Sequence, residues 1–70
     1  MNLLNTLLGI LQRTNVTELT ERFIELYEAI TQTLSVDDQQ VAQEALADRR
    51  LDNDEGHARL QAKLEAAKAQ

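Results

Sequence analysis

The side chains best suited to chemistry lie in one short segment, residues 49–57, which reads RRLDNDEGH and combines carboxylates with the only histidine. Carboxylates bind Ca²⁺ in an EF-hand loop, which needs a glycine at its sixth position and a bidentate glutamate at its twelfth. Counted from Asp52, Gly56 stands fifth and Lys63 twelfth, so the loop pattern fails twice. Asp54 and His57 could share a metal across one helical turn, but two ligands without a third do not make a site. We therefore expect no metal site and no cofactor.

Catalytic side chains are equally scarce. The chain has one histidine, one serine and no cysteine, and it lacks a glycine-rich phosphate loop. No pair of carboxylates lies in an evidently apolar segment, where burial could separate their pKa values for acid–base catalysis. A chain of 70 residues also has little room for a pocket that encloses a substrate. We expect no catalytic residues and no enzymatic activity.

The charge balance disfavours nucleic acid as a partner. Twelve acidic and seven basic residues give a net charge of −5, so neither half of the chain offers a basic face for phosphates. The only basic cluster is Arg49-Arg50, and acids stand on both sides of it. The acidic surface instead points to a basic protein partner or to mimicry of nucleic acid.

The elements that position these residues are expected to be helices. Proline is absent, only two residues are aromatic, and Leu, Ala, Glu and Gln are frequent, which favours helix over sheet. We predict an all-α fold, a small bundle-like array of three to four short helices in a single domain, residues 1–70. The periodicity and caps place these helices near residues 2–13, 16–34, 36–50 and 54–69.

The first predicted helix carries a broad apolar face formed by leucines at helical spacing, Leu4, Leu7, Leu8 and Leu11. The segment has no basic residue before its apolar run and is far shorter than the roughly 20 residues that cross a bilayer. We therefore expect neither a targeting signal nor a membrane span, and a cytoplasmic location. A peripheral membrane protein anchored by residues 2–13 stays open as an alternative.

The second predicted helix has two contrasting faces. Asn15 and Glu18 are placed to form a capping box at its start, and Phe23, Ile24 and Tyr27 belong to an apolar face suited to bundle packing. The opposite face carries four glutamates, here called the glutamate strip: Glu18, Glu21, Glu25 and Glu28. Glu18 is also spaced to pair with Arg22. The strip is either a surface for a basic partner or an ordinary solvated face.

The last two predicted helices depend on local caps. Ser35 is expected to cap the helix near 36–50, whose narrow face of small residues would pack closely on a neighbour. Its outer face is expected to carry Gln39, Gln43, Asp48 and Arg49. Asp52, Asn53 and Gly56 are poor helix-interior residues, so we predict a joint there, with Asn53 or Asp54 capping the final helix. One continuous or kinked helix is the alternative.

The apolar residues are unevenly shared between the halves. Counting Met, Leu, Ile, Val, Phe and Tyr, residues 1–35 hold fifteen and residues 36–70 hold six, so the second half must lean on the first or on another chain. We predict a small assembly, adaptor or inhibitor protein that binds a second copy of itself or a larger protein. The interface residues expected for it are Leu4, Leu7, Leu8, Leu11, Phe23, Ile24 and Tyr27.

The segment 44–67, which reads EALADRRLDNDEGHARLQAKLEAA, resembles the tails of small bacterial antitoxins, in which a polar, acidic helix wraps a toxin. The resemblance implies an alternative function, a regulator that neutralises a basic target through its acidic C-terminal half, with residues 36–70 partly disordered until they bind. The chain as a whole is similar to small helical proteins encoded by bacterial viruses and mobile elements.

Overall fold

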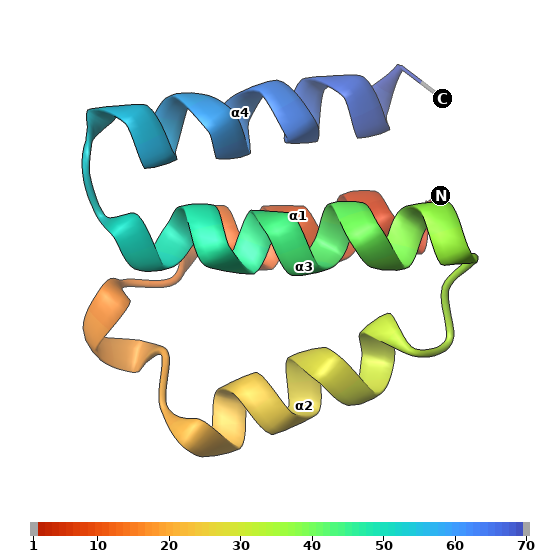
Figure 1. Cartoon of the computed structure of the whole chain (residues 1–70), viewed down its shortest axis with the longest axis horizontal. Helices are drawn as coiled ribbons and strands as arrows, with labels where there is room; N and C mark the ends of the chain where they lie inside the picture. Colours follow the sequence, from red (N-terminus) through yellow and green to blue (C-terminus); the bar gives the residue numbers. More distant parts are fainter. Residues whose placement is uncertain (1, 70) are drawn as a thin grey trace.

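The computed structural model describes residues 2–69, which form four α-helices and one 3₁₀ turn (Figure 1). The elements are α1 (Leu3–Arg13), η1 (Val16–Glu18), α2 (Glu21–Thr31), α3 (Val36–Leu51) and α4 (Asp54–Lys68). No strand occurs within these residues. The predicted all-α fold is confirmed.

Three of the helices form the body of the molecule. α1 and α3 run side by side in the same direction, and α4 returns antiparallel to them, so that each of the three contacts the other two (Figure 1). α2 lies on the far side from α4 and packs chiefly on α3. The Cα radius of gyration is 11.1 Å, which matches the value of about 11 Å for a compact chain of this length. The chain therefore closes a core by itself.

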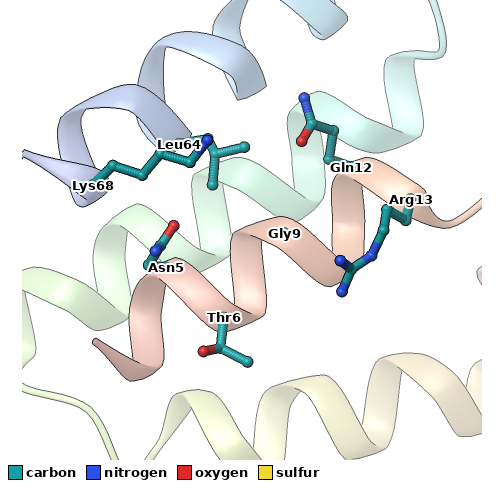
Figure 2. Close-up of a pocket in the computed structure, with 7 residues that line it drawn as sticks. All are labelled: Asn5, Thr6, Gly9, Gln12, Arg13, Leu64 and Lys68. Atoms are coloured by element: carbon teal, nitrogen blue, oxygen red, sulfur yellow. The ribbon is translucent and has the colours of Figure 1, made fainter. Parts of the chain in front are cut away.

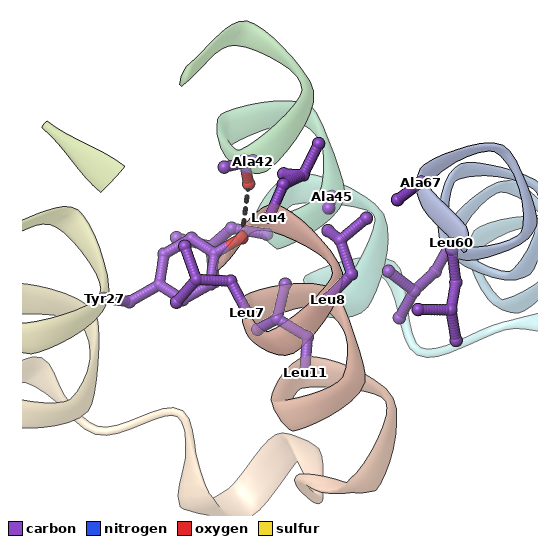
Figure 3. Close-up of a cluster of buried hydrophobic side chains, with 11 residues drawn as sticks. Leu4, Leu7, Leu8, Leu11, Tyr27, Ala42, Ala45, Leu60 and Ala67 are labelled. Atoms are coloured by element: carbon purple, nitrogen blue, oxygen red, sulfur yellow. Dashed lines mark hydrogen bonds between the residues drawn. The ribbon is translucent and has the colours of Figure 1, made fainter. Parts of the chain in front are cut away.

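The core lies where α1, α3 and α4 meet, with one side chain added by α2 (Figure 3). α1 contributes four leucines, while α3 and α4 contribute mostly alanines and leucines. Ala42 and Ala45 are completely buried, because small side chains allow close helix approach. The buried set is Leu4, Leu7, Leu8, Leu11, Tyr27, Ala42, Ala45, Leu46, Leu60, Leu64 and Ala67. The second half does lean on the first, as the apolar count predicted.

The predicted joint between the last two helices is confirmed. Asp52 ends α3 in the left-handed conformation with a φ of 47°, which a continuous helix cannot accommodate. Asn53 then caps α4, and its side-chain oxygen accepts a hydrogen bond from the Gly56 backbone N at 2.7 Å. A Cβ on Gly56 would stand 2.4 Å from the Asp48 carbonyl oxygen. Glycine at position 56 therefore lets α4 start directly against α3.

The helix predicted over residues 16–34 is wrong in its bounds, because the chain breaks between η1 and α2. The Glu18 carboxylate accepts from the Asn15 backbone N at 3.4 Å, so this cap starts a 3₁₀ turn only. Leu19 leaves the helical conformation, with φ −78° and ψ 60°, and packs against the core. Thr20 then starts α2 as a second N-cap, accepting from the Phe23 backbone N at 3.2 Å. The two N-caps, Asn15 and Thr20, therefore divide the single helix that the apolar periodicity alone predicts.

The second boundary in this region is set by Ser35, which caps α3 as predicted. Its hydroxyl accepts a hydrogen bond from the Asp38 backbone N at 3.3 Å. α2 has already ended at Thr31, so residues 32–34 form a turn between the two helices.

Two polar residues expected on the outer face of α3 are buried instead. Arg49 is 7% exposed, and its Nε donates to the carbonyl oxygens of Leu11 at 3.1 Å and Thr14 at 2.8 Å. These carbonyls lie at the C-terminal end of α1, where the regular i to i−4 hydrogen bonds of the helix stop, and the Leu11 carbonyl also accepts from the backbone N of the C-cap Thr14 at 3.2 Å. Asp48 is 6% exposed and pairs with Lys63 of α4. Both side chains are inside because partners far away in sequence satisfy them.

Candidate functional site

The predicted interface leucines lie inside the single chain. Leu4, Leu7, Leu8 and Leu11 are at most 2% exposed, and Figure 3 shows them facing the interior of the bundle, with Leu7 beside Tyr27 of α2. A partner could cover them fully only if the surrounding helices moved away. The interface assigned to these leucines stays a prediction, and the closed fold offers other apolar residues to a partner.

The predicted interface residues of α2 differ in how deeply they are buried. Tyr27 is buried, and its hydroxyl donates to the Ala42 carbonyl oxygen at 2.7 Å. Burial raises the pKa of the Tyr27 hydroxyl well above its usual value. The Phe23 ring stacks on the Tyr27 ring, with centroids 6.4 Å apart and planes inclined by 18°. Phe23 and Ile24 are partly buried against the core. Tyr27 is therefore the anchor of α2 and Phe23 its half-buried neighbour.

The largest apolar side chains left open on α2 are Leu26, 59% exposed, and Ile30, 40% exposed. With Phe23 they follow the spacing i, i+3, i+7 along one side of the helix, and we call these three residues the apolar edge of α2. A shallow groove of about 130 Å³ lies between this edge and α1, and its lining is completed by Tyr27 of α2 and by Leu7 and Ile10 of α1. Leu26 and Ile30 share the helical periodicity of the packed α2 residues, so their exposure could not be predicted from the sequence pattern.

The glutamate strip is exposed along its whole length, over η1 and α2. None of its four members forms an ion pair within residues 2–69. The expected pair between Glu18 and Arg22 is absent there because the break at Leu19 removes the helical spacing between them. Glu25 precedes Leu26, so its side chain is rotated by about 100° from Leu26 around the helix, whereas Glu21 and Glu28 lie roughly 140–180° from the residues of the apolar edge. A surface that covers the apolar edge would therefore meet Glu25 at its border, with Glu21 and Glu28 on the opposite face.

The acidic joint serves the helix ends. Asp52 lies 3.4 Å from Arg49 Nη1 and 3.7 Å from His57 Nε2, and Asn53 is the α4 cap. Across residues 2–69, no group of three His, Cys, Asp or Glu side chains could hold a metal ion. The polar side chains of Asp52 and Asn53 are thus explained by their contacts at the end of α3 and the start of α4.

A second, polar hollow of about 320 Å³ lies between α1 and α4 (Figure 2). Gly9 forms its centre, polar side chains of α1 surround the glycine, and α4 supplies the opposite wall. The lining residues are Asn5, Thr6, Gly9, Gln12, Arg13, Leu64 and Lys68. Sequence reasoning did not find this hollow, because only the packing of α4 on α1 creates it.

No helix within the described part of the chain has both the length and the apolar character needed to cross a membrane. In comparisons with known proteins, the chain matches no protein-family model, no curated protein and no solved structure.

Proposed function

We propose that the chain is a non-enzymatic protein-binding module that presents α2 to a groove on a larger protein. The observation that carries this proposal is the apolar edge of α2. Leu26 and Ile30 stay open to solvent, although the same chain buries every leucine of the α1 face. Large apolar side chains grouped on one helix face indicate a contact surface.

The spacing of the edge fits a common mode of recognition. A helix bound in a groove inserts side chains at positions i, i+3 and i+7 into apolar pockets, and Phe23, Leu26 and Ile30 have this spacing. The rest of α2 is already fixed by Tyr27 and its hydrogen bond to α3. Because the helix is formed before binding, the binding free energy is not reduced by the entropic cost of ordering it.

The charge next to the edge defines the partner. Glu25 stands beside Leu26 and has no ion pair within residues 2–69, so a groove with Lys or Arg at its rim would complement it. Glu21 and Glu28, on the opposite face, would add longer-range attraction for a basic partner. A second copy of the chain would instead bring its own glutamate strip and a net charge of −5, which opposes association. The proposed partner is therefore a larger protein with an apolar groove and a basic rim.

The other functions have less support. Ala45, Leu46 and Leu60 of α3 and α4 are buried in the core. The C-terminal half therefore has no apolar face left with which an antitoxin-like regulator could bind a toxin. The α1 face likewise points inward, so a membrane anchor over residues 2–13 would require α1 to leave the bundle.

The test is photo-crosslinking in host extract with a photoreactive side chain at position 26, compared with the same group at position 36. Val36 is the matched control because it is 81% exposed and lies at the start of α3. We expect one adduct from position 26, lost in the Ile30→Gln variant and weakened by the joint variant Glu21→Gln, Glu25→Gln, Glu28→Gln. Equal adducts from both positions, or adducts that ignore these substitutions, would contradict the proposal. The solution mass from light scattering shows whether the partner is instead a second copy of the chain.

A further inference from the structure

Gly9 occupies a position where the fold does not need glycine. It lies within α1, where glycine is less favourable than alanine because it gains more freedom on unfolding. Its φ is not positive, and a Cβ at this position would meet nothing within 4 Å. Gly56 differs, since packing there requires the missing side chain. The open space at Gly9 is therefore available to a group from outside the chain.

Two cations flank this space at its opposite ends. The side chains of Gln12 and Gln61 are hydrogen-bonded, which fixes the register of antiparallel α1 and α4. That register places Leu64 level with Gly9 and Lys68 level with Asn5. Helical side chains lean toward the N-terminus of their own helix, so Arg13 leans toward Gly9 and Lys68 leans toward Leu64. Figure 2 shows the Lys68 chain extended toward Leu64 on the α4 side of Gly9 and the Arg13 guanidinium on the other side of Gly9.

The lining of the hollow is one-sided in charge. Arg13 forms no ion pair within residues 2–69, and Lys68 has only the Glu65 carboxylate at 3.9 Å. Among residues 2–69, no acidic residue lines the hollow, although acids outnumber bases in the chain. The amide groups of Asn5 and Gln12 add neutral hydrogen-bonding capacity at the rim.

We infer that this hollow binds an anionic group of a small polar molecule, a phosphate or a carboxylate, above Gly9 and between Arg13 and Lys68. Charge-assisted hydrogen bonds from the guanidinium and ammonium groups hold the anion. The bare backbone at Gly9 lets the anion approach within reach of both cations. The hollow lies on the α1–α4 side of the molecule and does not depend on the function proposed for α2.

The experiment is an amide NMR titration of the whole chain with inorganic phosphate and, separately, with citrate, at constant ionic strength maintained with sodium chloride. We expect saturable shifts centred on Gly9 and its neighbours. The Gly9→Ala variant places a methyl group in the hollow, and we expect it to weaken binding by about tenfold while remaining folded. Lys68→Gln and Arg13→Gln each remove one charged donor, which we expect to cost about tenfold as well.

Arg50→Gln is the control for loss of one positive charge, because Arg50 is exposed on α3 away from the hollow. Saturation by phosphate alone identifies a phosphate site, and saturation by citrate alone identifies a carboxylate site. Absence of saturation with both anions up to about 10 mM, a concentration that would fill a millimolar site, overturns the inference. Gly9→Ala binding as tightly as the natural chain also overturns it. The variants of the apolar edge leave this titration unchanged, so the two proposals can fail separately.

Discussion

The two glycines of the chain provide a matched test of the packing, because the same substitution should have opposite effects. Both lie within helices, where replacing glycine by alanine stabilises the folded state by about 0.5–1 kcal/mol if the new methyl group fits. At Gly9 the methyl group meets nothing within 4 Å. We therefore expect Gly9→Ala to raise the free energy of unfolding by that amount.

At Gly56 the added Cβ would stand 2.4 Å from the Asp48 carbonyl oxygen and 3.0 Å from the Leu51 Cβ. The carbonyl belongs to the α3 backbone and cannot rotate away, so α3 and α4 must separate. Overpacking of this kind costs about 1–3 kcal/mol, which exceeds the gain in helix propensity. We expect Gly56→Ala to be less stable than the natural chain by about 1–2 kcal/mol, a large part of the roughly 4–10 kcal/mol typical for 70 residues.

Urea denaturation followed by far-ultraviolet circular dichroism measures both variants under one set of conditions. The corresponding changes in Tm are about 4–8 °C for each kcal/mol in a domain of this size. If Gly56→Ala were as stable as the natural chain, the close approach of α4 to α3 would be wrong. A destabilised Gly9→Ala would show that the outer side of α1 is covered.

Three further substitutions test the polar contacts of the core. Burial raises the pKa of Tyr27 above the unfolded value near 10, so stability present below about pH 10 is lost as the pH rises further. Tyr27→Phe loses one hydrogen bond and should lower the free energy of unfolding by about 1 kcal/mol at neutral pH. Above about pH 10, the free energy of unfolding of this variant should fall less steeply with pH than that of the natural chain. Denaturation across a pH series measures both slopes, and equal slopes would refute this prediction. Arg49→Met removes two bonds to α1 carbonyls and should cost about 2 kcal/mol in urea, against less than about 0.5 kcal/mol for exposed Arg50→Met. Lys63→Met leaves the buried Asp48 carboxylate unpaired and should cost about 3 kcal/mol in thermal denaturation, and adding Asp48→Asn should recover part of that loss.

Local chemistry made part of the fold predictable. Ser35 and Asn53 cap their helices through side-chain oxygens that reach backbone N–H groups three residues away, and such contacts can be read from adjacent residues. The same rule failed between Asn15 and Thr20, where two caps compete. Periodicity gives the faces of a helix but does not decide which cap the chain uses.

Contacts between distant segments explain the remaining differences. Arg49 and Asp48 are residue types usually found at the surface, and they are buried because α1 carbonyls and Lys63 complete their bonding. Leu26 and Ile30 share the apolar pattern of the packed α2 residues, yet they stay exposed because α1 leaves a shallow groove beside them and no other helix within residues 2–69 covers that side of α2. The hollow at Gly9 similarly depends on α4, which lies far along the chain.

The peripheral place of α2 has a consequence for the dynamics of the chain. α2 joins α1 and α3 through the segments 14–20 and 32–35 and packs chiefly on α3, while α1, α3 and α4 hold one another. Its amide protons should therefore exchange with solvent through local opening, whereas those of α3 should require global unfolding. In the opened form Tyr27 joins the apolar edge at the surface, so a partner that captures that form would gain a larger apolar contact than the closed fold displays.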